Sequence, residues 1–368
     1  MAFQPPHFTP PDFSKPGFLQ APPVIFEKVI QKGCAPPRYH ATSIYPEYFQ
    51  VRKGRWQLLE ESRMDGVVVL EAAGHLAVKE FRHLKIGDRV ALGRRENGED
   101  GIYVHTAAFG FSETQGDKFA FRTRLTRETS FSIDYDELYE LLEYERREGF
   151  TLWVLGPAVV FDHDAREAFV GLIERGYVDG LLAGNALAVH DIEGSLFGTA
   201  LGREIYSKKA ADLGHYKHLD AINQIIAAGS IKKAVRDGLI TSGIMRAVIH
   251  KKIPYVLAGS IRDDGPLPEV VADVTLAQDR MRRLTSRSTT VIAMATQLHA
   301  IATGNMVPSY RVLPSGQVRP VYFYSVDMSE FAVTKLANRG SLTARSILTN
   351  VQDFVVTVER GLRERFWA

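Results

Sequence analysis

The chain has 368 residues, more than one ordinary domain holds, and this length predicts two or three domains. Hydrophobic residues make up 45% of the chain and charged residues 24%, which excludes a disordered or fibrous protein. Forty-five basic residues stand against 43 acidic ones, and this net charge of +2 gives no electrostatic reason to expect nucleic acid or an anionic membrane as a partner.

The cysteine content and the apolar runs narrow the class of protein further. Cys34 is the single cysteine, so no internal disulfide bond can form, and no Cys/His cluster has the spacing of a zinc site. The N-terminus has no basic segment followed by an apolar run, and about 18 uninterrupted apolar residues occur nowhere. We expect a cytoplasmic protein that holds no metal and acts on a small molecule.

Residues 1–35 predict an extended arm. Seven of the 17 prolines fall within residues 1–25, and Phe3, Phe8, Phe13 and Phe18 recur every five residues, a spacing that fits neither a helix nor a strand. The phenylalanines either dock into grooves of the same subunit or a neighbouring one, or belong to a frayed tail.

Residues 36–130 predict a small β-rich domain. Short segments rich in β-branched residues, such as Gly66–Leu70 and Arg89–Leu92, are separated by glycines. The stretch from Asp134 to Arg147 predicts an amphipathic helix that connects this domain to the next. Its acidic residues are expected to form a solvated face.

Residues 131–368 predict the α/β class, a doubly wound parallel sheet of the Rossmann-like kind. Apolar runs of strand length alternate with amphipathic stretches, at residues 152–155, 178–182, 255–257, 291–294 and 321–326. Strands that are apolar on both faces and separated by helices indicate a parallel sheet covered on both sides.

In such a sheet, ligands bind beyond the carboxyl ends of the strands. Small polar turns that could approach a phosphate or ribose are Gly156-Pro157-Ala158, Gly184-Asn185-Ala186, Thr241-Ser242-Gly243, Gly259-Ser260 and Gly304-Asn305. The alternative is that loops of α/β proteins simply favour these residue types. Five such turns on one edge would favour a nucleotide site.

The glycine fingerprint G-x-G-x-x-G of dinucleotide-binding folds is absent. A strand–helix–strand unit nevertheless runs from Thr289 to Asp327, with Thr296 after its first strand as a candidate cofactor contact. Asp327 closes the second strand, where an acidic residue usually binds a ribose diol. It could equally cap a following helix over residues 329–336.

Two polar clusters are candidates for chemistry on a substrate. Arg262 could bind a carboxylate, and Asp263 or Asp264 an ammonium group, unless this run is an exposed turn whose charges pair with each other. His190-Asp191, with Glu193, could transfer a proton, or could be structural. The remaining candidates, expected to be core or surface residues rather than metal ligands, are His215, His218, His250 and His299.

Five segments together resemble one enzyme family: 181–193 (LLAGNALAVHDIE), 229–231 (GSI), 241–245 (TSGIM), 256–268 (VLAGSIRDDGPLP) and 334–341 (TKLANRGS). They are similar to the archaeal-type ornithine cyclodeaminases, a family that includes the C-terminal half of cyanobacterial bifunctional arginine dihydrolase/ornithine cyclodeaminase. The resemblance runs from about Pro36 to the C-terminus. The arrangement also resembles, more weakly, deoxyhypusine synthase, another NAD enzyme without the glycine fingerprint.

This resemblance implies conversion of L-ornithine to L-proline and ammonia with NAD that is used and regenerated in each turnover. It implies that Arg262 binds the carboxylate, that Asp263 and Asp264 recognise the amines, and that His190, Asp191 or Glu193 transfers protons. The residues that would hold NAD are Gly156, Pro157, Gly184, Asn185, Ala186, Thr241, Ser242, Gly243, Gly259, Ser260, Thr296, Gly304, Asn305 and Asp327.

The chain departs from the family at one rim. Relatives usually read Val-Asp-x-Asn-Pro around the last strand, whereas Asp327 is followed here by Met328-Ser329-Glu330, and an insertion at Tyr310–Pro320 lengthens the preceding loop. Such a change is consistent with another amino acid as substrate. Two other functions stay open: an amino-acid or opine-type dehydrogenase that consumes NAD, and a non-catalytic NAD-binding subunit. We also expect a homo-oligomer.

Overall fold

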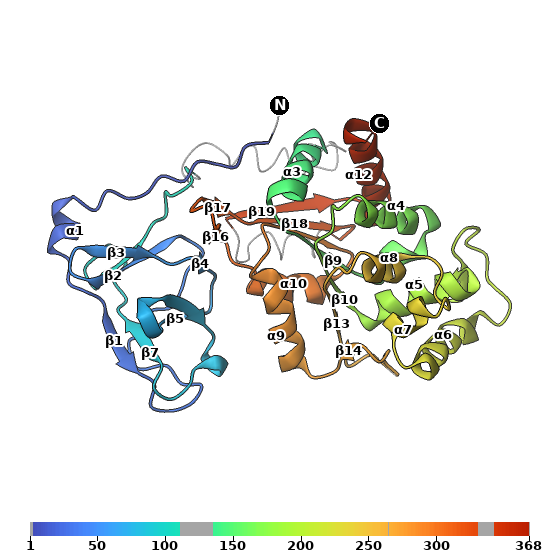
Figure 1. Ribbon diagram of the computed structural model, residues 1–368, viewed down its shortest axis with the longest axis horizontal. Helices are drawn as coiled ribbons and strands as arrows, with labels where there is room; N and C mark the ends of the chain where they lie inside the picture. Colours follow the sequence, from blue (N-terminus) through green and yellow to red (C-terminus); the bar gives the residue numbers. More distant parts are fainter. Residues whose placement is uncertain (1–2, 111–134, 264, 330–341, 368) are drawn as a thin grey trace.

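A parallel sheet organises the larger part of the protein. The computed structural model describes residues 3–110, 135–263, 265–329 and 342–367. Within these ranges a seven-stranded sheet has the spatial order β14-β13-β10-β9-β15-β18-β19, and every neighbouring pair is parallel (Figure 1). The strands are β9 (Thr151–Leu155), β10 (Gly180–Gly184), β13 (Tyr255–Ala258), β14 (Val270–Val271), β15 (Thr290–Met294), β18 (Tyr322–Asp327) and β19 (Thr343–Leu348). The predicted doubly wound α/β class is confirmed.

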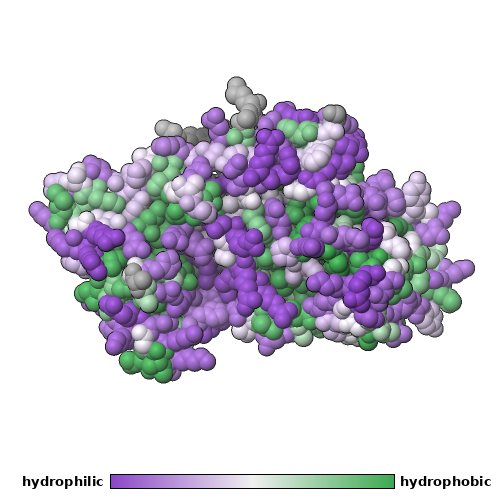
Figure 2. Space-filling view, viewed as in Figure 1, coloured by the Kyte–Doolittle hydropathy of each residue, from purple (hydrophilic) through white to green (hydrophobic). Residues whose placement is uncertain are grey.

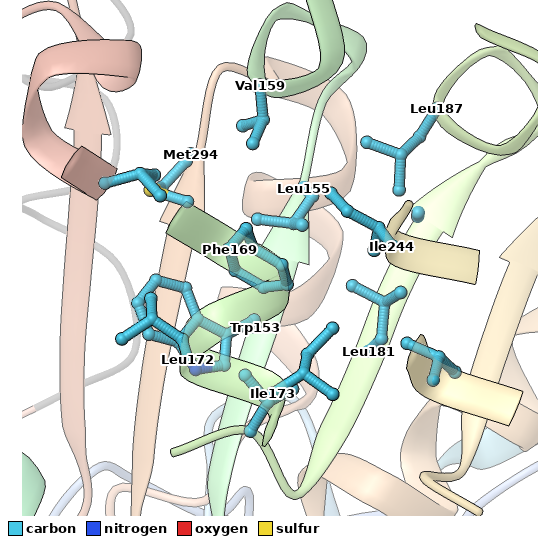
Figure 3. Close-up of a cluster of buried hydrophobic side chains, with 14 of the residues drawn as sticks. Trp153, Leu155, Val159, Phe169, Leu172, Ile173, Leu181, Leu187, Ile244 and Met294 are labelled. Carbon is cyan, nitrogen blue, oxygen red and sulfur yellow. The ribbon is translucent and has the colours of Figure 1, made fainter. Parts of the chain in front are cut away.

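Helices cover both faces of this sheet. Trp153 and Leu155 of β9 point to one face, where the Trp153 ring meets Phe169 edge-on at a centroid distance of 5.2 Å (Figure 3). Val154 points to the other face, in the core that contains Met281. The first face carries α3 (Tyr135–Glu148), α4 (His163–Glu174), α5 (Asn185–Phe197), α8 (Ile244–His250) and α12 (Val351–Phe366); the second carries α9 (Val274–Thr285) and α10 (Gln297–Met306). The helices α6 (Gly214–Ala228) and α7 (Ile231–Arg236) lie between α5 and α8 in the chain.

The smaller part is built from antiparallel sheets, as the segments of residues 36–130 predict. One sheet has the order β1-β7-β5-β6 and another β3-β2-β8. Their strands are β1 (Ile25–Lys28), β2 (Glu47–Arg52), β3 (Arg55–Leu58), β5 (Val67–Leu70), β6 (Leu76–Lys79), β7 (Arg89–Leu92) and β8 (Ile102–Val104). The strand β1 shows that sheet structure begins inside the segment expected to be an arm. The predicted boundary at residue 130 lies outside the described residues.

The insertion at Tyr310–Pro320 joins the two parts. It forms a hairpin of β16 (Tyr310–Val312) and β17 (Val318–Pro320), and β16 pairs with β4 (Glu61–Ser62) of the smaller part. Because the hairpin leads into the amino end of β18, it lies at the edge of the sheet opposite to the carboxyl ends. The expectation that it shapes the rim of a ligand site is therefore wrong.

Charged side chains line the same junction. Arg82 of the smaller part pairs with Asp279 of α9 at 2.9 Å, and Arg282 of α9 pairs with Glu80. On the face drawn in Figure 2, hydrophilic side chains gather where the two parts meet. The junction is thus held by a strand pairing and by ion pairs.

The acidic face predicted for residues 134–147 is only partly solvated. Glu145 of α3 is fully buried, where it pairs with Arg319 and accepts hydrogen bonds from the hydroxyls of Thr289 and Thr290. Glu143 is also buried, and hydrogen bonds from Arg146 outweigh its desolvation and lower the pKa of Glu143 to about 2. The prediction of a solvated acidic face is wrong at these two positions.

The phenylalanines of the arm dock on the arm's own chain. Phe13 stacks on Trp56 of the smaller part, with ring centroids 4.8 Å apart and planes 5° from parallel. Phe3 packs against Tyr144 of α3 and Tyr322 of β18, with centroids 5.5 and 5.7 Å apart. The arm, which includes the short helix α1 (Pro16–Gln20), therefore contacts both parts of the protein (Figure 1).

Replacing Phe13 with alanine is expected to lower the free energy of unfolding by about 1–3 kcal/mol, because the variant loses an aromatic stack and its buried area. The emission of Trp56 should shift to longer wavelength as water reaches its ring. Calorimetry and tryptophan fluorescence measure the two effects. Gln4→Ala, at an exposed position of the same arm, is the control. Unchanged emission in Phe13→Ala would contradict the docked arm.

Candidate functional site

The order of strands along the chain reverses between β9 and β15. The chain leaves β9 into η3 (Pro157–Phe161) on one face and leaves β15 into α10 on the other. Ligands of open α/β sheets bind in the crevice at such a switch point. Gly156-Pro157 and Thr296, all predicted cofactor residues, lie there.

The two turns at the switch point touch through their backbones. The amide of Gly156 donates to the carbonyl of Met294 at 2.8 Å. A Cβ atom at position 156 would lie 1.8 Å from the carbonyl oxygen of Ala295, so only glycine fits. Thr296 is the N-cap residue of α10, but its side chain makes no capping hydrogen bond. Its hydroxyl is not committed to the helix.

The next pair of strands, β10 and β13, ends at the same edge. Gly184 is the N-cap residue of α5, and Asn185 and Ala186 form its first turn. The side-chain oxygen of Asn185 accepts the amide of Leu267 at 3.1 Å, which ties the loop after β13 to α5. Ala186 is exposed, whereas the side chain of Asn185 is buried and serves this tie.

The loop after β13 carries the predicted substrate-binding charges. The amide of Ser260 donates to the Asp263 carboxylate at 2.8 Å, and the amide of Arg262 donates to the Ser260 hydroxyl at 3.2 Å. Arg262 is exposed, and its guanidinium forms no ion pair with the residues that the structure describes. Arg262 and Asp263 therefore do not form an ion pair with each other. Asp264 lies outside the described residues.

His299, which the sequence analysis set aside, belongs to this edge. It lies in the first turn of α10, and a Cβ atom at Gly184 would be 3.1 Å from its Cε1 atom. Burial lowers the pKa of His299 below its ordinary value, and the negative charge of Asp263 opposes that shift. The sequence could have indicated His299 as a site residue, because it lies about one helical turn after the end of an apolar strand.

His190 and Glu193 form a buried pair on α5. His190 Nδ1 lies 2.8 Å from Glu193 Oε2, and Glu193 also accepts the hydroxyl of Thr199 and the amides of Leu201 and Gly202. Burial favours the protonated form of Glu193, but the hydrogen bonds from His190 and Thr199 outweigh it and lower the pKa of this carboxyl. Glu193 is therefore a fixed acceptor that orients the ring of His190.

Asp191 is held by an arginine and by two backbone amides of α8. It is fully buried, accepts Arg166 Nε at 2.7 Å, and accepts the amides of Ile244 and Met245 at 3.0 and 2.7 Å. The carboxylate thus caps α8 and pairs with an arginine. These contacts give Asp191 a structural role, and its part in proton transfer stays a prediction.

The turn Thr241-Ser242-Gly243 does not follow a strand. It precedes α8, where the amides of Thr241 and Ser242 donate to the Ser195 hydroxyl at 3.1 and 3.2 Å. Gly243 faces the side chains of Arg166 and Asp191. The residue types that suggested a phosphate-binding turn here belong to a helix cap, so the prediction that this turn follows a strand is wrong.

Gly304 and Asn305 also lie away from the edge. They belong to the last turn of α10, and the nearest atoms to a Cβ at Gly304 are those of the Phe323 ring, at 3.7 Å. At a rise of 1.5 Å per residue, Gly304 lies about 10 Å along the helix from Gln297. A Gly-Asn pair is typical of loops, but here the helix continues through it. The prediction that Gly304 and Asn305 lie at the carboxyl edge is therefore wrong.

Asp327 has the place that the sequence predicts. It is the last residue of β18, which pairs in parallel with β15 and follows α10 in the chain. Its carboxylate accepts the amide of Ser329 at 2.9 Å. The helix proposed as the alternative partner of this carboxylate falls almost entirely on residues outside the described ranges.

The described residues contain neither a candidate metal site nor a helix that could span a membrane. No group of three or more histidine, cysteine, aspartate or glutamate side chains there could hold a metal ion. No helix among them has the length and apolar character needed to cross a membrane.

Comparisons with known proteins agree with this fold. Residues 137–358 match the family described as arginine dihydrolase ArgZ-like, C-terminal, Rossmann fold. Ornithine cyclodeaminase of Methanocaldococcus jannaschii is 39% identical over 323 residues, which cover 87% of this chain and 73% of that protein. A crystal structure of a LOR/SDH protein from Methanococcus maripaludis S2 superposes with a TM-score of 0.77 at 33% identity, covering 94% of this chain and 98% of that one.

One solved relative carries ligands. The ternary complex of AgrE with ornithine and NAD+ matches with a TM-score of 0.57 at 32% identity. The match covers 95% of this chain and 47% of AgrE, so the chain spans about half the length of that relative.

Proposed function

This chain belongs to the ArgZ-like C-terminal Rossmann-fold family that includes the ornithine cyclodeaminases, and from that membership we propose that it converts L-ornithine, or a close diamino acid, to a cyclic imino acid and ammonia with NAD. For ornithine the product is L-proline. The solved relative that binds ornithine and NAD+ together supports this choice of substrate and cofactor.

The residues at the switch point fit a dinucleotide. Only glycine fits at position 156, because a Cβ there would meet the Ala295 carbonyl, so the turns after β9 and β15 approach closely at the crevice where such ligands lie. Thr296 and the first amides of α10 offer donors to a diphosphate, and Asp327 offers a carboxylate to a ribose diol. We assign Gly156, Pro157, Thr296 and Asp327 to the cofactor.

The remaining groups of the edge suit a diamino acid. Arg262 presents an exposed guanidinium, without an ion pair to any described residue, that can bind a carboxylate with two hydrogen bonds, and Asp263 lies one residue away for an ammonium group. When bound, NAD+ would accept a hydride from the substrate α-carbon and return it later in the same turnover. The protein has to hold the α-carbon in place and to remove protons from the two amines.

The observation that carries this proposal is that Gly156, Thr296, Arg262 and Asp263 share one carboxyl edge of a parallel sheet. The test is to incubate the protein with NAD+ and isotopically labelled ornithine and to follow proline and ammonia by mass spectrometry. A mixture of diamino acids in the same assay reports the preferred ring size. Steady accumulation of reduced nicotinamide would indicate a dehydrogenase, and bound NAD without ammonia release would indicate a non-catalytic subunit.

Arg262→Ala is expected to raise KM for the amino acid by roughly 30- to 1000-fold, since a charged hydrogen bond to the substrate is lost at a cost of about 2–4 kcal/mol. The affinity for NAD, measured by fluorescence titration, should not change. Asp327→Ala should do the reverse and weaken NAD binding. Arg283→Ala, an exposed arginine on α9, is the matched control. The opposite pattern would show that the two subsites are misassigned.

A further inference from the structure

His299 occupies the place where the two halves of the site meet. It belongs to α10, the helix that starts at the switch-point turn of Ala295 and Thr296. Its ring reaches to Gly184, the residue before α5, with 3.1 Å between its Cε1 atom and the position of a Cβ there. A single imidazole thus lies between the helix that follows β15 and the helix that follows β10.

The surroundings of this ring favour a neutral imidazole. His299 is partly buried, and the loss of water that would stabilise an imidazolium lowers the pKa of the ring. Gly184, the residue before α5, has no charged side chain, and the side-chain oxygen of Asn185 already accepts the amide of Leu267. Among the described residues, the charge that acts on the ring comes from Asp263, whose carboxylate is fixed by the Ser260 amide. A proton taken up by His299 would therefore be stabilised by a carboxylate already in place.

Other described histidines do not combine these properties. His190 is hydrogen-bonded through Nδ1 to Glu193 on its own helix and meets the ring of Phe161 edge-on, with centroids 5.5 Å apart. His215 and His250 are exposed on α6 and at the end of α8. His299 alone of these four lies beside the charged loop after β13.

The reaction proposed above needs a proton acceptor before hydride transfer. At neutral pH the α-amine of an amino acid is an ammonium ion, which has no electron pair to form the carbon–nitrogen double bond when hydride leaves the α-carbon. One N–H bond must break first, with the electron pair remaining on nitrogen. A neutral imidazole within hydrogen-bond reach is the group that most often takes such a proton in enzymes.

We propose that His299 is the residue that takes the proton from the α-ammonium group of the substrate. The proton forms an N–H bond on the imidazole, the substrate is left as a neutral amine, and the imidazolium faces the carboxylate of Asp263. The proton returns to the amine that departs as ammonia. This inference rests on the proposed function, because it assigns a step of that reaction.

The variants His299→Gln and His299→Ala test the proposal. The value of kcat should fall by roughly 100- to 10,000-fold, which is the contribution of a general base. The affinity for NAD should stay within about threefold, or about 0.6 kcal/mol. Wild-type activity should fall as the pH drops through the pKa of His299, below its ordinary value of about 6.5, because the protonated ring cannot accept a proton. That limb should be absent in His299→Gln, whereas His250→Gln, at an exposed position, should keep it.

Added imidazole separates proton transfer from a structural role. It should restore activity to His299→Ala in proportion to its concentration, an effect that a merely structural histidine would not show. A variant with wild-type kcat and an unchanged pH profile, or an inactive variant that folds but gains nothing from imidazole, would overturn the proposal.

A second measurement does not need turnover. In a proton–nitrogen spectrum of the histidine rings, the His299 signal is identified by its absence from His299→Gln. Addition of NAD+ and ornithine to the wild-type protein should move that signal and leave the His250 signal in place. If the wild-type protein makes no proline, the proposed function fails, and an unmoved His299 signal would separately overturn the assignment of His299.

Discussion

Glu145→Ala is expected to destabilise the protein by about 3–5 kcal/mol, which is the cost of leaving a buried charge without its partner. Both members of the Glu145–Arg319 pair are fully buried, and Glu145 also accepts the hydroxyls of Thr289 and Thr290. These contacts hold α3 against the amino end of β15 and against the hairpin that meets β4. Unfolding by chemical denaturant, followed by circular dichroism, measures the loss.

The loss of stability should come from the charge of Arg319 left without its partner, and not only from removal of the Glu145 side chain. Glu145→Leu combined with Arg319→Met removes both charges and is expected to recover a large part of the stability. Glu137→Ala is the matched control on the same helix, because its pair with Arg345, at 2.9 Å, is about 40% exposed on both sides and contributes about 1 kcal/mol or less. If Glu145→Ala unfolds at the same denaturant concentration as Glu137→Ala, the pair has no such role.

Gly156→Val is expected to abolish most of the NAD binding. Its Cβ would lie 1.8 Å from the Ala295 carbonyl oxygen, so the two turns at the switch point would have to separate. Overpacking of this kind costs about 1–3 kcal/mol of stability, and a distorted diphosphate site should weaken NAD by roughly 100-fold, or about 2.7 kcal/mol. Titration of intrinsic fluorescence with NAD measures the affinity, and calorimetry measures the stability.

Gly304→Ala provides the comparison. Position 304 lies inside α10, and an added Cβ would make an ordinary contact at 3.7 Å with Phe323. Alanine should stabilise the helix by up to about 1 kcal/mol and leave NAD binding intact. A protein that loses NAD on Gly304→Ala and keeps it on Gly156→Val would place the cofactor elsewhere.

The sheet could be predicted where its strands are apolar on both faces, as in residues 152–155 and 291–294. The two edge strands were missed for physical reasons. The strand β14 has only two residues, and β19 (Thr343–Leu348) is half-buried along most of its length, so neither forms an apolar run. The spatial order of the strands could not be predicted from the sequence, because the pairing of β9 with β15 is seen only in the structure.

A place at the carboxyl edge could be predicted for Gly156, which directly follows β9, and for Asp327, which ends β18, whereas their contact with a cofactor stays a prediction. The same residue types misled where they cap or complete a helix, as Gly243 and Gly304 show. The burial of Glu145 could not be foreseen, since Arg319 is 174 residues away in the chain. His299 belongs to no motif, and the role proposed for it depends on where α10 begins. The expected homo-oligomer stays a prediction.

The docked arm sets an order for folding during synthesis. Phe3 leaves the ribosome early, but one of its two partners, Tyr322, belongs to the sixth strand of the large sheet in chain order. At about 5–20 residues per second, translation makes the second residue tens of seconds after the first. The early-made ring therefore waits, exposed to water or to chaperones, until the Rossmann sheet is nearly finished. Its burial then marks the addition of β18 to the sheet, so protease resistance of the arm in ribosome-bound chains would report how far folding has advanced.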